Sequence, residues 1–422
     1  MASSKNIQAA WDAFVAFDAL KGHPEVAQNL PHPPFYALDR LCRFITFSRP
    51  VTKTHFRAQL AVMRRMWEAG GKPPLAAWNS LINFAGKGLR TGSKEEYKTA
   101  VSIFNDMVAG RCPGSRLPKG VIDYGRLTNH INTPIQPNLV TFNILLDVAT
   151  RSLHSDSVKH AVGLFTQSGF APDFISHMCM LRYHSKKRSL EGVRATLTKI
   201  KEQRIIMPID GFNAVISAYA YNNRHDLALA VFRLLENNIT LSDDQEGIHS
   251  VRDLLSREER LEVPDNVKPD VATYTAMIQS MAYIGDFVHT FDIFNEFLSS
   301  RDTARIHPST SAAFRAVFLG FSKHGADPSW IVPDTGEVSR WNLSNLQLVF
   351  RLFLKLPAQE VPTRSTVYWI MSAFDKTSGH DKKLLREVWA QMKGRYTTAR
   401  PMLFSQPRLR RMEETIYNYT PH

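Results

Sequence analysis

The feature that most constrains this sequence is a 35-residue period in its middle part. Three segments with the same layout begin at positions 139, 174 and 209, and each holds a candidate helix, a short turn and a second candidate helix. A fixed period of this length is typical of repeat arrays, in which each repeat packs only on its neighbours. The period therefore predicts an all-α protein in which pairs of helices are stacked along the chain.

The composition is compatible with a long, folded repeat array. The chain has 422 residues, of which 44% are hydrophobic, so it holds enough apolar material to fold. Its formal net charge of +13 suggests a polyanionic partner, although a basic enzyme would show the same balance. Cys42, Cys112 and Cys179 are scattered and odd in number, which fits a reducing compartment better than a disulfide scaffold.

The N-terminal residues 1–34 are interpreted as a helix or half-repeat that belongs to the fold. A candidate helix from Trp11 to Leu20 is followed by a proline-rich break, and the segment contains acids but no arginine. Transit peptides are rich in arginine and poor in acids, so there is no clear presequence here. No apolar run in the chain approaches the roughly 18–20 residues of a transmembrane helix, so we expect no membrane span.

The paired-helix pattern extends over residues 35–398 as about seven repeats. The first helices of the pairs are expected near 35, 75, 139, 174, 209 and 271, followed by a region from 311 to 364 that holds one pair or two. Apolar side chains at helical spacing form one face of each helix, and we interpret these faces as core. Examples are Phe142, Leu145 and Val148, then Val158, Ala161, Val162 and Phe165, then Phe212, Val215, Ile216 and Tyr219, and finally Tyr274, Met277, Ile278 and Met281.

Three segments interrupt the period and are interpreted as inserted loops: 111–136, 240–266 and 327–340. The segment 240–266 contains eight acidic residues and three arginines, which leaves a net charge of −5. Because phosphate repels such a segment, we expect it to lie away from any nucleic-acid groove. Residues 399–422 have little apolar periodicity and several arginines, and we interpret them as a basic C-terminal tail.

The junctions between repeats resemble those of the pentatricopeptide repeat (PPR) family. The segments NLVTFN at 138–143 and PDVATYT at 269–275 are similar to the P-D-V-x-T-Y-N junction of that family, and the 35-residue period matches it. Tetratricopeptide repeats have a period of about 34 residues and a pattern that is absent here. Over residues 35–398 the resemblance implies a right-handed α-solenoid whose concave face binds single-stranded RNA, about one base per repeat.

The resemblance also implies which residues contact RNA. In this family the fifth residue of a repeat and the residue just before the next repeat specify one base. The corresponding pairs in this sequence are Asn79 with Asn138, Asn143 with Asp173, Asn213 with Asp270, and Thr275 with Ser309 or Thr310. An Asn–Asp pair resembles the family's uracil pairing and an Asn–Asn pair its pyrimidine pairing, which implies uracil opposite Asn143 and Asn213.

Other repeats depart from the family's pattern. Met178 and Pro208 offer no polar group to a base edge, while Arg315 and Tyr368 occupy fifth positions at which phosphate contact and stacking are expected instead. The basic cluster 186–188 fits either a phosphate contact or a solvated turn. Because asparagine near a helix start is often a cap, a purely structural role for the paired asparagines stays an open alternative.

No motif in the sequence carries catalytic or metal chemistry. The segment GKGLRTGSK at 86–94 lacks the spacing of a phosphate-binding P-loop, and no strand precedes it. His177, Cys179 and His184 lie in a predicted core helix without a fourth ligand. No deaminase or nuclease signature follows the repeats. We therefore expect a protein that is not an enzyme and that uses no metal, no cofactor and no small-molecule substrate.

These observations and the resemblance imply a sequence-selective RNA-binding protein of the mitochondrial matrix. The insertions and loose repeats are similar to those of fungal mitochondrial PPR proteins, particularly those that act in 5′-end maturation of small-subunit ribosomal RNA. Mitochondrial rRNA or mRNA and the mitoribosomal small subunit are then candidate partners. Two alternatives stay open: a factor for stability or translation of a mitochondrial mRNA, and a protein-binding α-solenoid scaffold without RNA readout. The location follows from the resemblance alone.

Overall fold

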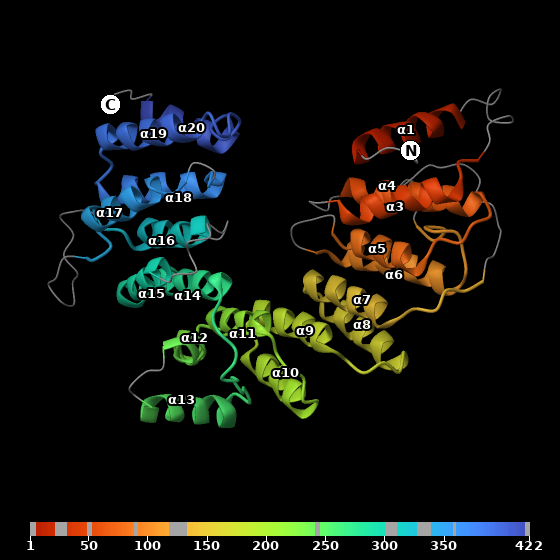
Figure 1. The fold of residues 1–422 in the computed structure, drawn as a ribbon, viewed down its shortest axis with the longest axis horizontal. Coiled ribbons are helices and arrows are strands. Elements are labelled where there is room, and N and C mark those ends of the chain that lie inside the picture. The colour runs from red at the N-terminus through yellow and green to blue at the C-terminus, as the bar shows by residue number, and fades with distance from the viewer. Residues whose placement is uncertain are drawn as a thin grey trace. The chain divides into compact units, whose positions relative to one another are not determined.

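The computed structural model divides the chain into two compact units, residues 1–187 and 188–422 (Figure 1). Their described part consists of helices and turns and contains no strand. The predicted all-α fold of stacked helix pairs is confirmed in each unit. The structure describes residues 6–21, 32–48, 53–87, 92–117, 133–240, 245–299, 310–326, 339–357 and 360–417.

The first unit is a stack of helix pairs. Its helices are α1 (Ile7–Lys21), α3 (Phe35–Phe47), α4 (Lys53–Glu68), α5 (Leu75–Ala85), α6 (Lys94–Val108), α7 (Leu139–Ser152), α8 (Ser155–Gln167) and α9 (Phe174–Lys186). The pairs are α3–α4, α5–α6 and α7–α8, and α1 packs on α3. The first helices α3, α5, α7 and α9 pack on one another in this order, so their exposed edges form one continuous face.

The second unit repeats this arrangement. Its helices are α10 (Leu190–Glu202), α11 (Ile209–Tyr221), α12 (His225–Thr240), α13 (Gln245–Glu258), α14 (Val271–Ile284), α15 (Phe287–Ser299), α16 (Thr310–His324), α17 (Leu343–Leu354), α18 (Arg364–Thr377), α19 (Lys382–Tyr396) and α20 (Pro407–Tyr417). The first helices α11, α14, α16 and α18 pack in sequence, each with its second helix beside it. The region of uncertain phase between 311 and 364 therefore contains two first helices, α16 and α18.

Several first helices begin at a capping box, in which the cap side chain and the third helical residue bond to each other's backbone N–H. Asp173 Oδ1 accepts from the N–H of Ser176 at 2.9 Å, and the N–H of Asp173 donates to Ser176 Oγ at 3.1 Å. The same reciprocal bonds occur at Asn138 with Thr141 for α7 and at Asp270 with Thr273 for α14. The polar residue before each of these helices thus determines where the helix starts.

The predicted core faces are buried with one exception. Val162 is 40% exposed, so its assignment to the core was wrong, because the buried stripe of α8 consists of Val158, Ala161 and Phe165. Phe142 of α7 packs edge-on against Phe165 with ring centroids 6.0 Å apart, which joins the two helices of this repeat. The apolar stripes of α11 and α14 are buried as predicted.

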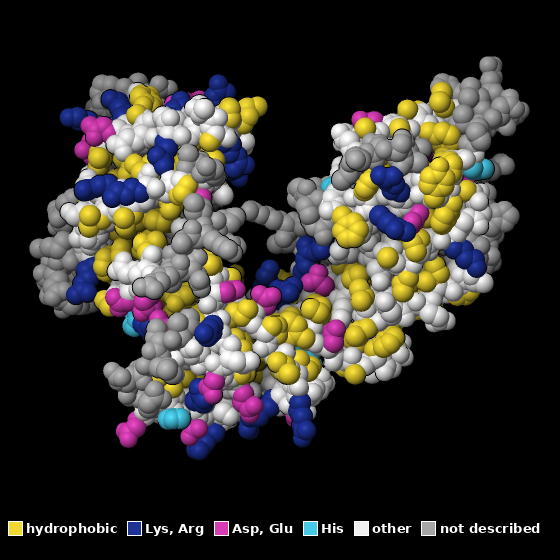
Figure 2. All heavy atoms as spheres, viewed as in Figure 1, with side chains coloured by type: hydrophobic (Ala, Val, Ile, Leu, Met, Phe, Trp, Pro, Cys, Tyr) yellow, Lys and Arg dark blue, Asp and Glu magenta, His cyan; other side chains and the backbone are white. Residues whose placement is uncertain are grey.

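The segment 240–266, predicted as an inserted loop, contains the helix α13, which packs on α12. Leu255 is fully buried, and the carboxylate of Glu259 accepts from Arg194 Nε at 3.0 Å and from Arg194 Nη2 at 2.6 Å. The hydroxyl of Tyr219 donates to Glu259 at 3.3 Å. Figure 2 shows acidic and basic side chains side by side around α13. Part of the negative charge of this segment is therefore neutralised within the fold.

The C-terminal segment 399–422, predicted as a tail, contains α20, which packs on α18 and α19. Leu409 and Ile416 are buried, and Glu413 accepts hydrogen bonds from Trp389 Nε1 at 3.0 Å and Lys393 Nζ at 2.7 Å. Of the other two predicted insertions, residues 118–132 and 327–338 lie outside the described part.

Candidate nucleic-acid interface

The predicted pairs meet at the junctions between successive first helices. In each pair, the asparagine lies on one first helix and its partner is the N-cap of the next first helix in the stack. The amide nitrogen of the asparagine lies within hydrogen-bond distance of its partner at all three junctions. The distances are 3.4 Å for Asn79 to Asn138, 3.0 and 3.1 Å for Asn143 to the two carboxylate oxygens of Asp173, and 3.2 Å for Asn213 to Asp270.

The Asn143 junction between α7 and α9 is the most completely bonded of the three. Asn143 Nδ2 donates to Asp173, and Ser176 Oγ lies 2.7 Å from Asn143 Oδ1 and donates to it. A carboxylate can only accept, so Asp173 requires the NH₂ side of the amide and thereby sets its orientation. Asn143 is 7% exposed, and its second N–H and second oxygen lone pair are not used by these bonds. One donor and one acceptor of fixed orientation are left for a ligand.

The carboxyl of Asp173 is held in its charged form. Partial burial on its own raises the pKa, but the backbone N–H of Ser176 and the amide of Asn143 donate to the carboxylate and outweigh burial, so the pKa lies below its usual value. The charged Asp173 therefore both caps α9 and orients Asn143. This links the start of one repeat to the candidate base-contacting residue of the previous one.

The Asn79 junction between α5 and α7 uses the same plan without a charge. Thr141 Oγ1 donates to Asn79 Oδ1 at 2.8 Å, while the bond from Asn79 Nδ2 to Asn138 is long at 3.4 Å. Two amides can each turn over and still bond, so an Asn–Asn pair fixes its donor and acceptor sides less strongly than an Asn–Asp pair does. This junction is expected to discriminate less between bases.

The Asn213 junction between α11 and α14 differs in one bond. Here Thr273 Oγ1 donates to Asp270 at 2.8 Å instead of to the asparagine. The Oδ1 atom of Asn213 is buried and has no hydrogen-bond partner among the described residues. An unsatisfied buried acceptor costs about 1–3 kcal/mol, so a donor supplied by a ligand would be favourable at this junction.

Exposed aliphatic side chains beside the junctions were missed in the sequence. Val140 on α7 and Ile175 on α9 each follow the N-cap by two positions and are 52% and 51% exposed. Val140 lies three residues before Asn143, so both occupy the same side of the helix. A flat heterocycle could therefore pack its face on the exposed aliphatic group while the edge of the heterocycle forms hydrogen bonds with the neighbouring amide. In the sequence, these residues could have been recognised as apolar residues that lie outside the core stripe of each helix.

The remaining predicted contacts are not arranged as amide pairs. Thr275 donates its hydroxyl to the carbonyl of Val271 in its own helix at 2.8 Å, so that hydroxyl is already used. Arg315 is half-buried and makes no hydrogen bond or ion pair to another described residue, whereas Ser309 lies outside the described part. The ring of Tyr368 lies under the guanidinium of Arg408, 3.8 Å from it. The last repeats therefore present arginine and an aromatic ring instead of amide pairs.

Met178 and the basic cluster 186–188 also lie in the described part. Met178 is buried, and Pro208 precedes α11 without a side-chain cap. Neither side chain provides a polar group for a base, as the sequence indicates. The three residues of the cluster 186–188 are exposed at the end of α9, so their charges face solvent.

The described residues contain no group of three or more potential metal ligands among His, Cys, Asp and Glu. Burial raises the pKa of the Cys179 thiol to about 12, and that of Cys42 to about 12, so both are neutral thiols near pH 7. No helix among the described residues is both long and apolar enough to cross a membrane.

Comparison with known proteins gives one family match. A family model described as PPR repeat matches residues 211–238 and 272–301, which cover α11–α12 and α14–α15. No curated protein matches the chain. Among solved structures, the pentatricopeptide repeat protein PPR10 in complex with an 18-nt psaJ RNA element is similar, with 12% identity and a TM-score of 0.40 over 97% of this chain and 60% of that one. PPR10 from maize aligns with 14% identity and a TM-score of 0.31 over 91% of this chain and 58% of that one.

Proposed function

We propose that this chain, which contains pentatricopeptide repeats, binds single-stranded RNA through the face formed by its first helices. The observation that carries the proposal is the Asn143 junction, where Asp173 and Ser176 hold a nearly buried amide in one orientation. The exposed Val140 and Ile175 lie in the first turns of the two helices that meet there. A base would lie on the aliphatic groups while its edge meets the amide. The likeness to PPR10, which was solved with an RNA element, agrees with this choice of ligand.

The proposed sequence preference is for pyrimidines. Uracil presents both a donor and an acceptor on its edge, which the one free donor and one free acceptor of Asn143 can meet. Adenine presents such a pair as well, so the choice of uracil follows the resemblance of the Asn–Asp pair to the family's uracil pairing. We assign uracil to the Asn143 and Asn213 junctions and either pyrimidine to the Asn79 junction. The arginine and aromatic residues of the last repeats add affinity that depends little on sequence, because guanidinium groups bind phosphate and rings stack on any base.

The proposed role is non-catalytic. RNA bound along the first helices is sheltered from nucleases or kept single-stranded, and other factors are recruited to it. We place this activity in the mitochondrial matrix, in maturation of the small-subunit rRNA at its 5′ end or in assembly of the mitoribosome. Action on the stability or translation of a mitochondrial mRNA is the alternative within the same class. Sequencing of RNA crosslinked to the protein in cells distinguishes the two.

The first test compares fluorescently labelled oligo(U) and oligo(A) of equal length by anisotropy. We expect tighter binding of oligo(U), and a loss of roughly 1–3 kcal/mol per base contact in the variant Asn143→Ala with Asn213→Ala. The matched control is Asn222→Ala, because the amide of Asn222 donates to the carbonyl of Ala218 in its own helix at 2.8 Å. Equal affinity for both oligonucleotides, or no effect of the double substitution, refutes base recognition and favours a protein-binding scaffold.

A further inference from the structure

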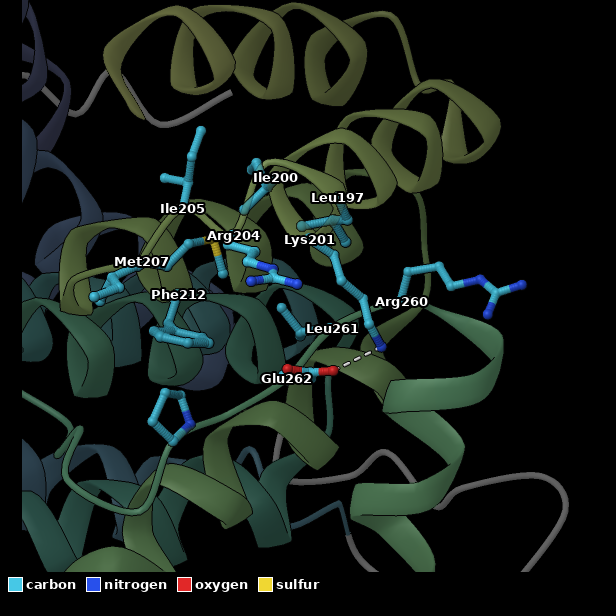
Figure 3. Close-up of a pocket in the computed structure, with 12 residues that line it drawn as sticks. Leu197, Ile200, Lys201, Arg204, Ile205, Met207, Phe212, Arg260, Leu261 and Glu262 are labelled. Carbon is cyan, nitrogen blue, oxygen red and sulfur yellow. Dashed lines mark ion pairs between the residues drawn. The ribbon is translucent and has the colours of Figure 1, made fainter. Parts of the chain in front are cut away.

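The second unit contains a pocket that belongs to none of the three junctions. It lies between the end of α10, the link 205–208 and the segment 260–264 that follows α13 (Figure 3). Its volume is about 290 Å³, which is close to the lower limit of about 300 Å³ for ligand sites. The lining side chains that are almost completely buried are all apolar: Leu197, Ile200, Met207, Phe212 and Leu261.

Two arginines at the rim adopt a backbone conformation that favours glycine. Arg204 follows α10 with φ of 51°, and Arg260 follows α13 with φ of 57°. Gly285 occupies the comparable place after α14, with φ of 90°. A side chain at such a position is strained, and retained strain is often associated with a functional site. Both strained residues line the same pocket: in Figure 3 the guanidinium of Arg204 lies over it, whereas the long side chain of Arg260 starts at its rim and points outward.

The rim carries more positive than negative charge. Lys201 pairs with Glu262 at 2.7 Å, an interaction marked in Figure 3, and Glu262 is the only acid lining the pocket. The guanidinium groups of Arg204 and Arg260 make no hydrogen bond or ion pair to another described residue. Two cations without partners therefore lie beside an apolar floor, although the neighbouring segment 240–266 is acidic.

The walls of the pocket are fixed before any ligand binds. Glu259, directly before Arg260, is 1% exposed and takes both hydrogen bonds from Arg194 of α10. It also accepts from Tyr219 of α11. These bonds join α10, α11 and the end of α13, which flank the pocket, so binding requires little ordering of the protein.

We infer that this pocket binds a short acidic segment of a partner protein, with an aliphatic side chain in the cavity and flanking carboxylates on Arg204 and Arg260. Guanidinium groups bind carboxylates in a bidentate manner, and a central apolar anchor with charged neighbours is typical of a protein interface. Ile206 is 87% exposed at the rim and extends the apolar contact. Glu262 is already paired with Lys201, so the cations left for the flanking carboxylates are Arg204 and Arg260.

The test uses saturation-transfer NMR on the full chain with the peptide acetyl-Gly-Asp-Leu-Asp-Gly-amide. Two matched peptides replace either both aspartates by asparagine or the leucine by glycine. We expect the acidic leucine peptide to bind roughly tenfold more tightly than either. Equal signals for the acidic and the asparagine peptides, or no signal for any peptide, would overturn the proposal. This comparison uses the unmodified protein.

The protein variant is Arg204→Gly with Arg260→Gly. Glycine suits both φ values, so we expect an unchanged or higher Tm together with roughly tenfold weaker peptide binding. Arg188→Gly is the matched control, because Arg188 has φ of 53° and lies outside the pocket, and it should leave peptide binding unchanged. Weaker oligo(U) binding with unaltered peptide binding in the double variant would assign the pocket to RNA and refute the proposal. If peptide affinity falls while oligo(U) affinity stays the same, the result supports the peptide site, and it does so whether or not the chain binds RNA.

Discussion

Replacement of Asp173 tests whether one carboxylate both starts a helix and orients the candidate base-contacting amide. In Asp173→Ala, the N–H of Ser176 loses its side-chain acceptor at 2.9 Å, and Asn143 Nδ2 loses both carboxylate oxygens at 3.0 and 3.1 Å. In Asp173→Asn, one side-chain oxygen is kept and can still cap α9. The two variants thus separate loss of the negative charge from loss of every acceptor.

The expected magnitudes follow from these bonds. Loss of an N-cap costs about 1 kcal/mol, and leaving the nearly buried amide of Asn143 without its acceptor costs about 1–2 kcal/mol more. We therefore expect Asp173→Ala to lower the free energy of unfolding by about 2–3 kcal/mol and Asp173→Asn by about 1 kcal/mol. The control Asp381→Ala removes a cap at α19 that bonds only to backbone N–H groups, so it should cost about 1 kcal/mol.

The assay is urea unfolding followed by circular dichroism, repeated from pH 7 to pH 3. Because the pKa of Asp173 is lowered in the folded protein, its contribution is present above its unfolded pKa of about 3.9 and is lost as the pH falls through the folded pKa. The difference between the parent and Asp173→Asn should therefore shrink toward low pH. A loss in Asp173→Ala no larger than that in Asp381→Ala would refute the shared role of the carboxylate.

Three further predictions concern stability and binding. Burial and the nearby Glu236 raise the pKa of Glu296 to about 7, so its stabilising effect is present below pH of about 4.5 and is lost as the pH rises through 7. We therefore expect the free energy of unfolding of Glu296→Gln, measured in urea, to rise relative to that of the parent between pH 5 and pH 8. The rise should be only about 1 kcal/mol, because the Glu296 side chain is 36% exposed. A difference between the two proteins that does not change with pH would contradict this. In Glu259→Ala, Arg194 loses its buried partner, so the free energy of unfolding should fall by about 2–3 kcal/mol and the amides of α13 should exchange hydrogen faster. The control Glu262→Ala removes an exposed ion pair and should change the free energy of unfolding by less than about 1 kcal/mol. RNA affinity should fall with salt with a log–log slope of about −0.7 per phosphate contacted, and a salt-independent affinity would exclude phosphate contacts.

The period and the helical spacing of apolar residues were sufficient to predict the helix pairs and their cores. Spacing determines which side chains share a helix face, so the stripes that include Phe142 and Phe212 were correctly assigned to the core. The pairs Asn143–Asp173 and Asn213–Asp270 were selected through the resemblance to the PPR family, and the structure places both pairs in contact. Their contact with RNA stays a prediction.

Details that depend on three-dimensional packing could not be predicted. Nothing in the sequence indicates that Ser176 donates to the previous repeat's asparagine while Thr273 does not, since both residues cap their own helices alike. α13 was missed because its segment interrupts the 35-residue period and is rich in acids. Arg194, which pairs with Glu259 directly after this helix, is distant in sequence. α20 was missed because its buried side is small, with Leu409 and Ile416 as its fully buried residues.

The most direct test of RNA binding by the first helices is UV crosslinking of the full chain to oligo(U), with crosslinked peptides located by mass spectrometry. We expect crosslinks in the first turns of α7, α9 and α11, at residues 139–143, 174–178 and 209–213, and their loss from 139–143 in Asn143→Ala. Crosslinks confined to the second helices or to the basic cluster 186–188 would contradict it.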